Sequence, residues 1–122
     1  MNPVVYFEIP VLDLDRACDF YSKVFETTLT RDIVDGYQMA FFDSSAESFG
    51  ASGALVVGDV YVPSQQGCFL YFGVESIDET LARAIEHGGS VLYPKKSNGD
   101  LGSVAEIQDS EGNRIALHEE SK

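Results

Sequence analysis

The sequence contains the same succession of expected elements twice, and this repeat limits the possible folds more than any other feature. In the first half, Val4–Val11 alternates in the manner of a strand, and Asp13 is a good N-cap for a helix that ends at Phe25. Apolar residues in this helix recur every three or four positions, which indicates one buried face. Further strands are expected at Thr28–Val34, Tyr37–Asp43 and Ala54–Val62.

The second half follows the same order. A strand is expected at Cys68–Val74, and Ser76-Ile77-Asp78-Glu79 has the pattern of a capping box at the start of the next helix. That helix is expected to end at His87, because Gly88-Gly89 is a helix stop signal. Three more strands are expected at Val91–Lys95, Val104–Gln108 and Arg114–His118.

Aligning the two halves of the sequence matches Val11 with Val74 and Asp13 with Ser76. Two βαβββ units predict an α+β fold with two curved sheets, each carrying its helix on one face. The expected units cover about residues 1–62 and 67–122. We expect them to form a single domain, because 122 residues is the size of one domain.

The charge balance excludes whole classes of partner. Twenty acidic residues against eight basic ones give a net charge of −12, which repels nucleic acids and anionic membranes. A solubilising acidic surface and the steering of a cationic ligand both fit this charge. No apolar run approaches the ~20 residues of a membrane-spanning helix. The two cysteines, Cys18 and Cys68, lack disulfide or metal spacing, and no signal peptide is visible, so a cytoplasmic location is expected.

Two strings carry a family resemblance. The first is Ile9-Pro10-Val11-Leu12-Asp13-Leu14-Asp15-Arg16-Ala17 followed by Phe20-Tyr21, and the second is Asp109-Ser110-Glu111-Gly112-Asn113-Arg114-Ile115-Ala116-Leu117. With these two strings and Gly88-Gly89 in this order, the chain resembles the vicinal oxygen chelate superfamily. That superfamily includes glyoxalase I, extradiol dioxygenases and bleomycin-resistance proteins. The resemblance implies mixed sheets curved around a cavity, with the helices on the other side.

Strand alternation then predicts which side chains face the cavity. The helix of the first unit should cover Phe7 and Ile9, which leaves Tyr6 and Glu8 on the open face. In the second unit the open face should hold Arg114, Ala116 and His118 from the last strand, and Phe69 and Tyr71 from the first. Ala54 and Val56 are expected to face inward from the strand that ends the first unit.

The resemblance also implies where a metal would bind. Metal-dependent members place their ligands at positions that correspond to Tyr6, Ala54, Phe69 and Ala116 of this chain. Alanine and phenylalanine cannot coordinate a metal ion, and tyrosine is at best an uncommon ligand. We therefore expect no metal and no other cofactor.

One step further along the strands, the same face carries Glu8, Val56, Tyr71 and His118. We predict Glu8 and His118 as a catalytic acid–base pair, since histidine titrates near neutral pH. Tyr71 can donate to a developing oxyanion, and Tyr6, Phe69 and Tyr71 are predicted to bind substrate. Simpler interpretations stay open: Glu8 can be a solvated residue, His118 an exposed residue near the C-terminus, and Tyr71 a cavity wall.

From these residues we expect a glyoxalase-like protein that binds a small organic molecule. Metal-independent isomerase or lyase chemistry on that molecule is one expectation. Whether the chain is an enzyme is left open. The alternatives are a ligand-sequestering protein of the bleomycin-resistance type, a metal-dependent glyoxalase or dioxygenase, and a subunit with a vestigial cavity. A homodimer is expected, because two open sheets leave edges and apolar faces to be covered.

Overall fold

The computed structural model describes residues 3–43 and 50–121 and contains both expected units. The first unit comprises β1 (Tyr6–Pro10), α1 (Leu14–Val24), β2 (Leu29–Val34), β3 (Tyr37–Phe42) and β4 (Ser52–Val57). The second comprises β5 (Tyr71–Gly73), α2 (Ile77–Glu86), β6 (Ser90–Ser97), the 3-10 turn η1 (Gly99–Leu101), β7 (Ser103–Gln108) and β8 (Arg114–Glu119).

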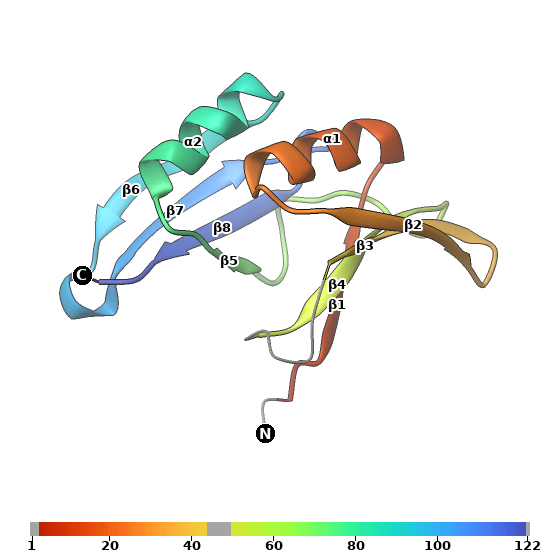
Figure 1. Cartoon of the computed structure of the whole chain (residues 1–122), viewed down its shortest axis with the longest axis horizontal. Coiled ribbons are helices and arrows are strands. Elements are labelled where there is room, and N and C mark those ends of the chain that lie inside the picture. Colours follow the sequence, from red (N-terminus) through yellow and green to blue (C-terminus); the bar gives the residue numbers. More distant parts are fainter. Residues whose placement is uncertain (1–2, 44–49, 122) are drawn as a thin grey trace.

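Each unit folds its strands into one mixed sheet with the same topology. The strand order is β1-β4-β3-β2 in the first sheet and β5-β8-β7-β6 in the second. The first strand of each unit runs parallel to the last, and the other pairs are antiparallel. The predicted α+β fold with two repeated units is therefore confirmed. In Figure 1 both helices lie above the sheets.

The helices begin at the predicted caps. The side chain of Asp13 accepts a hydrogen bond from the Arg16 backbone N–H at 3.0 Å, and that of Ser76 accepts one from Glu79 N–H at 3.2 Å. These caps satisfy N–H groups that have no partner inside the helix. In the part of the chain that the structure describes, neither helix is long and apolar enough to span a bilayer.

The helix-covered faces of the two sheets share one hydrophobic core. Aromatic rings from both units meet there: Phe25 and Phe72 have ring centroids 4.4 Å apart, and Phe7 and Phe72 6.1 Å. Tyr21 packs in the same cluster and is fully buried. Because β1, α1 and β5 all contribute to this cluster, the two units are held together along their helix-covered sides.

The hairpin between β7 and β8 ties the second unit to the first through buried polar groups. The buried Glu111 carboxylate accepts hydrogen bonds from Leu12 N–H at 2.9 Å, Asp13 N–H at 2.8 Å and Arg16 Nε at 2.7 Å. The Tyr21 hydroxyl donates to Asp109 at 2.6 Å. The hairpin predicted at this turn is present, but its role as a link between the units was not foreseen.

All the predicted strands differ somewhat in length from the observed ones. The strand expected at Val4–Val11 is Tyr6–Pro10, the one expected at Val91–Lys95 is Ser90–Ser97, and two others are shortened by three or more residues. The strand expected at Ala54–Val62 begins at Ser52 and ends at Val57, because Tyr61 N–H turns back to the Gly58 carbonyl. The strand expected at Cys68–Val74 is confined to Tyr71–Gly73. Single hydrogen bonds to β8 continue beyond both ends of β5, from Ala116 N–H to Leu70 O and from Val74 N–H to His118 O.

Candidate functional site

The open face of the first sheet carries a carboxylate held by two phenols. On β1, Phe7 and Ile9 pack in the shared core, so Tyr6 and Glu8 lie on the opposite face, as alternation predicts. The Tyr6 hydroxyl donates to one oxygen of Glu8 at 2.9 Å, and the Tyr61 hydroxyl donates to the other at 3.0 Å. Glu8 is thus fixed by donors on both oxygens.

Both phenols stay protonated beside this carboxylate. Partial burial, together with the hydrogen bond to Glu8 and its charge, raises the pKa of Tyr6 to about 12. The hydrogen bond to Glu8 also raises the pKa of Tyr61, with burial adding to it. A negative charge next to a phenol opposes its ionisation, so both hydroxyls remain hydrogen-bond donors at physiological pH.

An apolar floor lies next to Glu8. Met39, Ala54 and Val56 are buried on this face as a cluster separate from the shared core. Ala54 pairs with Glu8 across the β1–β4 ladder, and the aromatic side chains of Tyr37, Phe41 and Tyr61 pack over the cluster. The Tyr37 and Tyr61 rings meet edge to face at the border of this cluster, with centroids 5.3 Å apart.

Tyr61 is the residue that sequence reasoning missed on this face. It was assigned to a continuous strand, whereas it lies in the loop after β4 and folds back over the sheet. The signal that could have found it is Gly58-Asp59, a pair typical of turns. A turn there ends the strand and frees the next aromatic residue to contact the open face.

The open face of the second sheet is more exposed. Phe69 and Tyr71 are 46% and 52% exposed. The Arg114 guanidinium lies 5.4 Å from the Phe69 ring centroid, and its Nε is 3.3 Å from a Glu106 oxygen. Arg114 Nε is buried and forms no hydrogen bond within the described residues. Sequence reasoning placed Arg114 on this face without a role and missed Glu106, which β7 positions opposite Ala116.

His118 lies on this second face, close to Tyr71. Across the β5–β8 ladder Tyr71 pairs with Ala116, and His118 pairs with Gly73, which has open space where a side chain would be. His118 Nε2 is 2.8 Å from the Leu101 carbonyl oxygen, which orients the ring if Nε2 carries the proton. His118 then keeps Nδ1 available as a base.

The structure places Glu8 and His118 on different sheets. Within the described residues no hydrogen bond or ion pair joins them, since Glu8 accepts from two tyrosines and His118 Nε2 faces a backbone carbonyl. The second sheet carries Tyr71 and His118 on neighbouring strands, and the first brings Tyr6 and Glu8 into a hydrogen bond. Each face is therefore half of the predicted site.

The positions implied as metal ligands are occupied by Tyr6, Ala54, Phe69 and Ala116. Both alanines are fully buried in the sheets and have no donor atom to offer. Over residues 3–43 and 50–121, three or more His, Cys, Asp or Glu side chains are nowhere grouped as a metal site. These residues do not fit the metal centre that the resemblance implies.

Comparison with solved structures gives the same fold. A glyoxalase/bleomycin resistance protein/dioxygenase domain from Frankia sp. EAN1pec has a TM-score of 0.74 at 20% identity, covering 99% of both chains. TnmS3, an antibiotic binding protein from Streptomyces sp. CB03234, has a TM-score of 0.68 at 26% identity, covering 99% of this chain and 98% of its own. A mutant glyoxalase I from Zea mays matches at a TM-score of 0.70 and 19% identity, over 96% of this chain but only 46% of the maize chain.

Comparison with curated proteins gives no significant match. The family model described as Glyoxalase/Bleomycin resistance protein/Dioxygenase superfamily matches residues 4–117, almost the whole length. The repeat, the sheet topology and this match agree with one another. The chain belongs to the glyoxalase/bleomycin resistance protein/dioxygenase superfamily.

Proposed function

We propose that this protein binds a small organic molecule over the open face of its first sheet, with Glu8 as the polar anchor. The observation that carries the proposal is the Glu8 carboxylate, which accepts hydrogen bonds from Tyr6 and Tyr61 beside an apolar floor. An apolar surface with a few fixed polar groups is the usual composition of a ligand site.

The hydrogen bonds already made to Glu8 define which polar group the ligand must carry. A carboxylate has about four lone-pair positions, so two remain after the tyrosine hydrogen bonds. A ligand hydroxyl, amide or ammonium group can donate to them. The apolar body of the ligand then lies against Tyr37, Phe41 and Tyr61, the partly buried side chains that pack over this cluster. TnmS3, which is described as an antibiotic binding protein, supports a ligand of this kind.

Binding without turnover is the function that the geometry favours. Catalysis by proton transfer needs an acid and a base within reach of the same substrate atoms. In one chain, Glu8 and His118 lie on different sheets and have different partners. The protein is therefore proposed to sequester its ligand.

Acid–base catalysis is the second candidate function, and it depends on a homodimer. The open face of the second sheet exposes Phe69 and Tyr71, an apolar surface suited to cover by another subunit. A symmetric dimer that places this face over the first sheet of its partner would bring His118 towards Glu8 of the partner subunit. We propose a cytoplasmic, single-domain homodimer, and the two free thiols, Cys18 and Cys68, support the reducing compartment.

A thermal-shift screen of flat organic compounds, followed by calorimetry, tests the binding proposal. Glu8→Gln should weaken the binding of a hit by at least about tenfold, because a hydrogen bond to a charged group is lost. Glu86→Gln, an exposed change on α2, is the matched control and should leave affinity unchanged. Equal affinity in the wild type and Glu8→Gln would overturn the proposal.

Deuterium exchange tests the catalytic candidate. A bound hit that contains an acidic C–H bond is incubated in D₂O with the protein, and exchange is followed by NMR. Catalysis by the pair predicts exchange that is lost in both Glu8→Gln and His118→Gln. Exchange no faster than in buffer would rule out this role and leave binding as the function.

Light scattering tests the dimer. The expected mass is twice the 13.3 kDa of the chain at micromolar concentration. Tyr71→Asp, which puts a charge on the open face of the second sheet, should shift this mass towards the monomer. A monomer mass for the wild-type protein would refute the dimer.

A further inference from the structure

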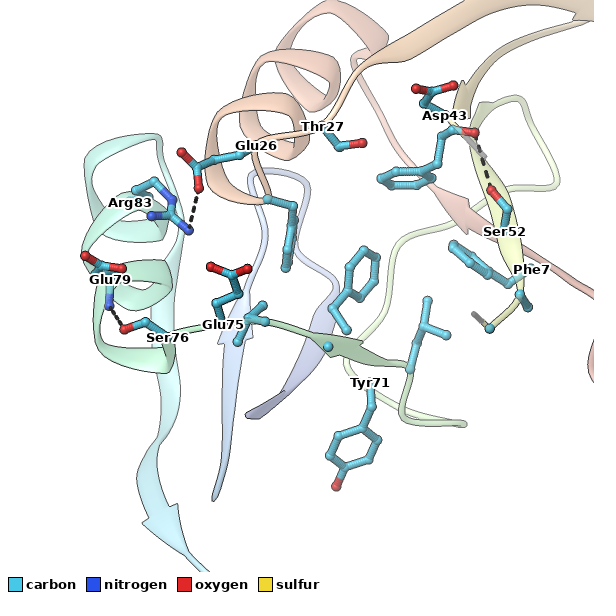
Figure 2. A pocket seen from close by; sticks show the side chains of 18 of the residues that line it. Phe7, Glu26, Thr27, Asp43, Ser52, Tyr71, Glu75, Ser76, Glu79 and Arg83 are labelled. Carbon is cyan, nitrogen blue, oxygen red and sulfur yellow. Dashed lines mark hydrogen bonds and ion pairs between the residues drawn. The ribbon is translucent and has the colours of Figure 1, made fainter. Parts of the chain in front are cut away.

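A hollow of about 670 Å³ lies between the two units, apart from the open sheet faces (Figure 2). The segment that follows α1 contributes Phe25, Glu26 and Thr27 to its wall, and α2 contributes Glu79 and Arg83. The rest of the wall comes from Val4 and Phe7, from Phe42 at the end of β3 and Asp43 after it, and from residues 50–52 and 70–76. We call this hollow the inter-unit groove. Its volume is typical of small-molecule pockets.

The floor of the inter-unit groove is aromatic. Phe7, Phe25, Phe42 and Phe72 all line it, and each of them is only half-buried although it packs against the shared core. Their rings contact one another, with Phe42 and Phe72 centroids 5.8 Å apart. These side chains belong to the helix-covered faces of the sheets, so the groove is a separate surface from the Glu8 face. In Figure 2 the Tyr71 ring points away from this floor.

The rim of the groove is acidic. Glu26, Asp43, Glu75 and Glu79 stand around the floor, and the lining holds one cation, Arg83. Arg83 is already engaged, because its Nε donates to the Val24 carbonyl at 2.9 Å and a terminal nitrogen lies 3.7 Å from Glu26. Within the described residues, Asp43, Glu75 and Glu79 form no ion pair.

We propose that the inter-unit groove binds a small organic cation with a flat aromatic body. The body stacks on the phenylalanine rings, and the cationic group lies beside the carboxylates of Glu75 and Glu79, on the opposite side of the floor from Asp43 (Figure 2). Aromatic faces attract cations, and carboxylates on a partly enclosed apolar surface add to that attraction. This site is additional to the one proposed around Glu8, and neither proposal depends on the other.

Charge selects this occupant over the alternatives. An organic anion meets four carboxylates and one engaged guanidinium, so it is repelled. A second copy of the chain, with eight basic residues against twenty acidic ones, offers little positive charge to match the four carboxylates of this rim. A metal ion holds its hydration shell and has no apolar body to cover the aromatic floor.

The floor also predicts how binding affects stability. Phe7, Phe25 and Phe42 come from the first unit, and Phe72 comes from the second. A ligand stacked on them bridges the units in the native state only. Binding should therefore raise the melting temperature, and the shift should grow with the logarithm of the ligand concentration above the dissociation constant.

Three acridines of nearly the same shape test the proposal at pH 7.5 by calorimetry. 9-Aminoacridine is cationic, acridine is neutral and acridine-9-carboxylate is anionic. The cation should bind tightest and the anion should not bind measurably. Glu75→Gln combined with Glu79→Gln should weaken binding of 9-aminoacridine by about tenfold, since two attractive charges are removed. Glu86→Gln, an exposed change elsewhere on α2, should have no effect.

Glu8→Gln separates the two sites, because it should leave 9-aminoacridine binding unchanged. Loss of binding in Glu8→Gln but not in Glu75→Gln/Glu79→Gln would overturn the groove site. Equal affinity for the three acridines would also overturn it, since charge would then play no part. If the double variant instead increases the mass in light scattering and the wild type does not bind 9-aminoacridine, the groove is a contact between copies and the proposal fails.

Discussion

Replacing Glu111 by glutamine should remove much of the link between the two units. Burial on its own would raise the pKa of the Glu111 carboxyl, but hydrogen bonds from Arg16, the Asp13 and Leu12 backbone N–H groups and Ser110 outweigh it and lower the pKa from 4.5 to about 2. A difference of this size corresponds to about 3 kcal/mol of stabilisation of the charged form. Arg16 is half-exposed and therefore screened by solvent, so we expect Glu111→Gln to cost about 2 kcal/mol.

The same contacts predict a pH dependence with a definite sign. The folded protein holds the ionised carboxylate, whereas the unfolded chain titrates near the ordinary value of 4.5. The contribution of Glu111 is complete above that value and is lost as the pH falls towards about 2. The unfolding free energies of the wild type and Glu111→Gln should therefore differ most at pH 7 and converge in acid.

Urea denaturation followed by circular dichroism measures both effects. Unfolding curves are recorded at pH 7, 5, 4 and 3, with Glu86→Gln as the control for an exposed carboxylate on α2. The two proteins should show similar denaturant slopes, so that a change in midpoint reports stability. A Glu111→Gln protein as stable as the wild type at pH 7 would refute the reasoning, as would a difference that does not shrink in acid.

Three further changes should alter stability, and each is measured by the same urea titration at pH 7. Tyr21→Phe removes the buried hydroxyl that donates to Asp109 and leaves that carboxylate with one donor fewer, at a cost of about 1–3 kcal/mol; no change would show that the bond adds nothing. Gly89→Ala places a methyl group 2.6 Å from the Gln108 carbonyl oxygen and 2.8 Å from the Phe20 ring, at a cost of about 1–3 kcal/mol, and a fully stable variant would contradict this packing. Asp13→Ala removes the cap of α1 and should cost about 1 kcal/mol, whereas Asp13→Asn, which keeps an acceptor, should cost less.

The elements of the fold could be predicted because their signals are local. The alternation of Val4–Val11 and the apolar spacing of the first helix each depend on a few neighbouring residues. The repeat then adds the order of elements, and the structure has the same order in both units. Strand ends were less predictable: β4 stops at Val57 because of a turn, although apolar residues continue beyond it.

The contacts between distant segments could not be predicted in the same way. Alternation indicates that Glu8 faces away from the helix, but the hydrogen bond from Tyr61 depends on how a loop folds over the sheet. The hairpin at Asp109–Asn113 is visible as a turn, yet the bonds from Glu111 to Leu12 and Asp13 join residues almost a chain length apart. Such contacts follow from the packing of the two units and leave no periodic pattern in the sequence.

That packing leads to one more prediction. The units share a core through Phe7 and Phe72, so their helix-covered faces meet, and within the described chain Glu8 and His118 form no hydrogen bond or ion pair with each other. If a ligand of the Glu8 site needs both faces, a second subunit must supply one of them. Its affinity should then fall when the protein is diluted below the dissociation constant of the dimer. If the Glu8 face suffices, affinity should not depend on protein concentration, and Tyr71→Asp should bind as the wild type does. Fluorescence titration of a Glu8-site ligand over a thousandfold range of protein concentration distinguishes the two results, and a constant affinity would refute a site built from two subunits.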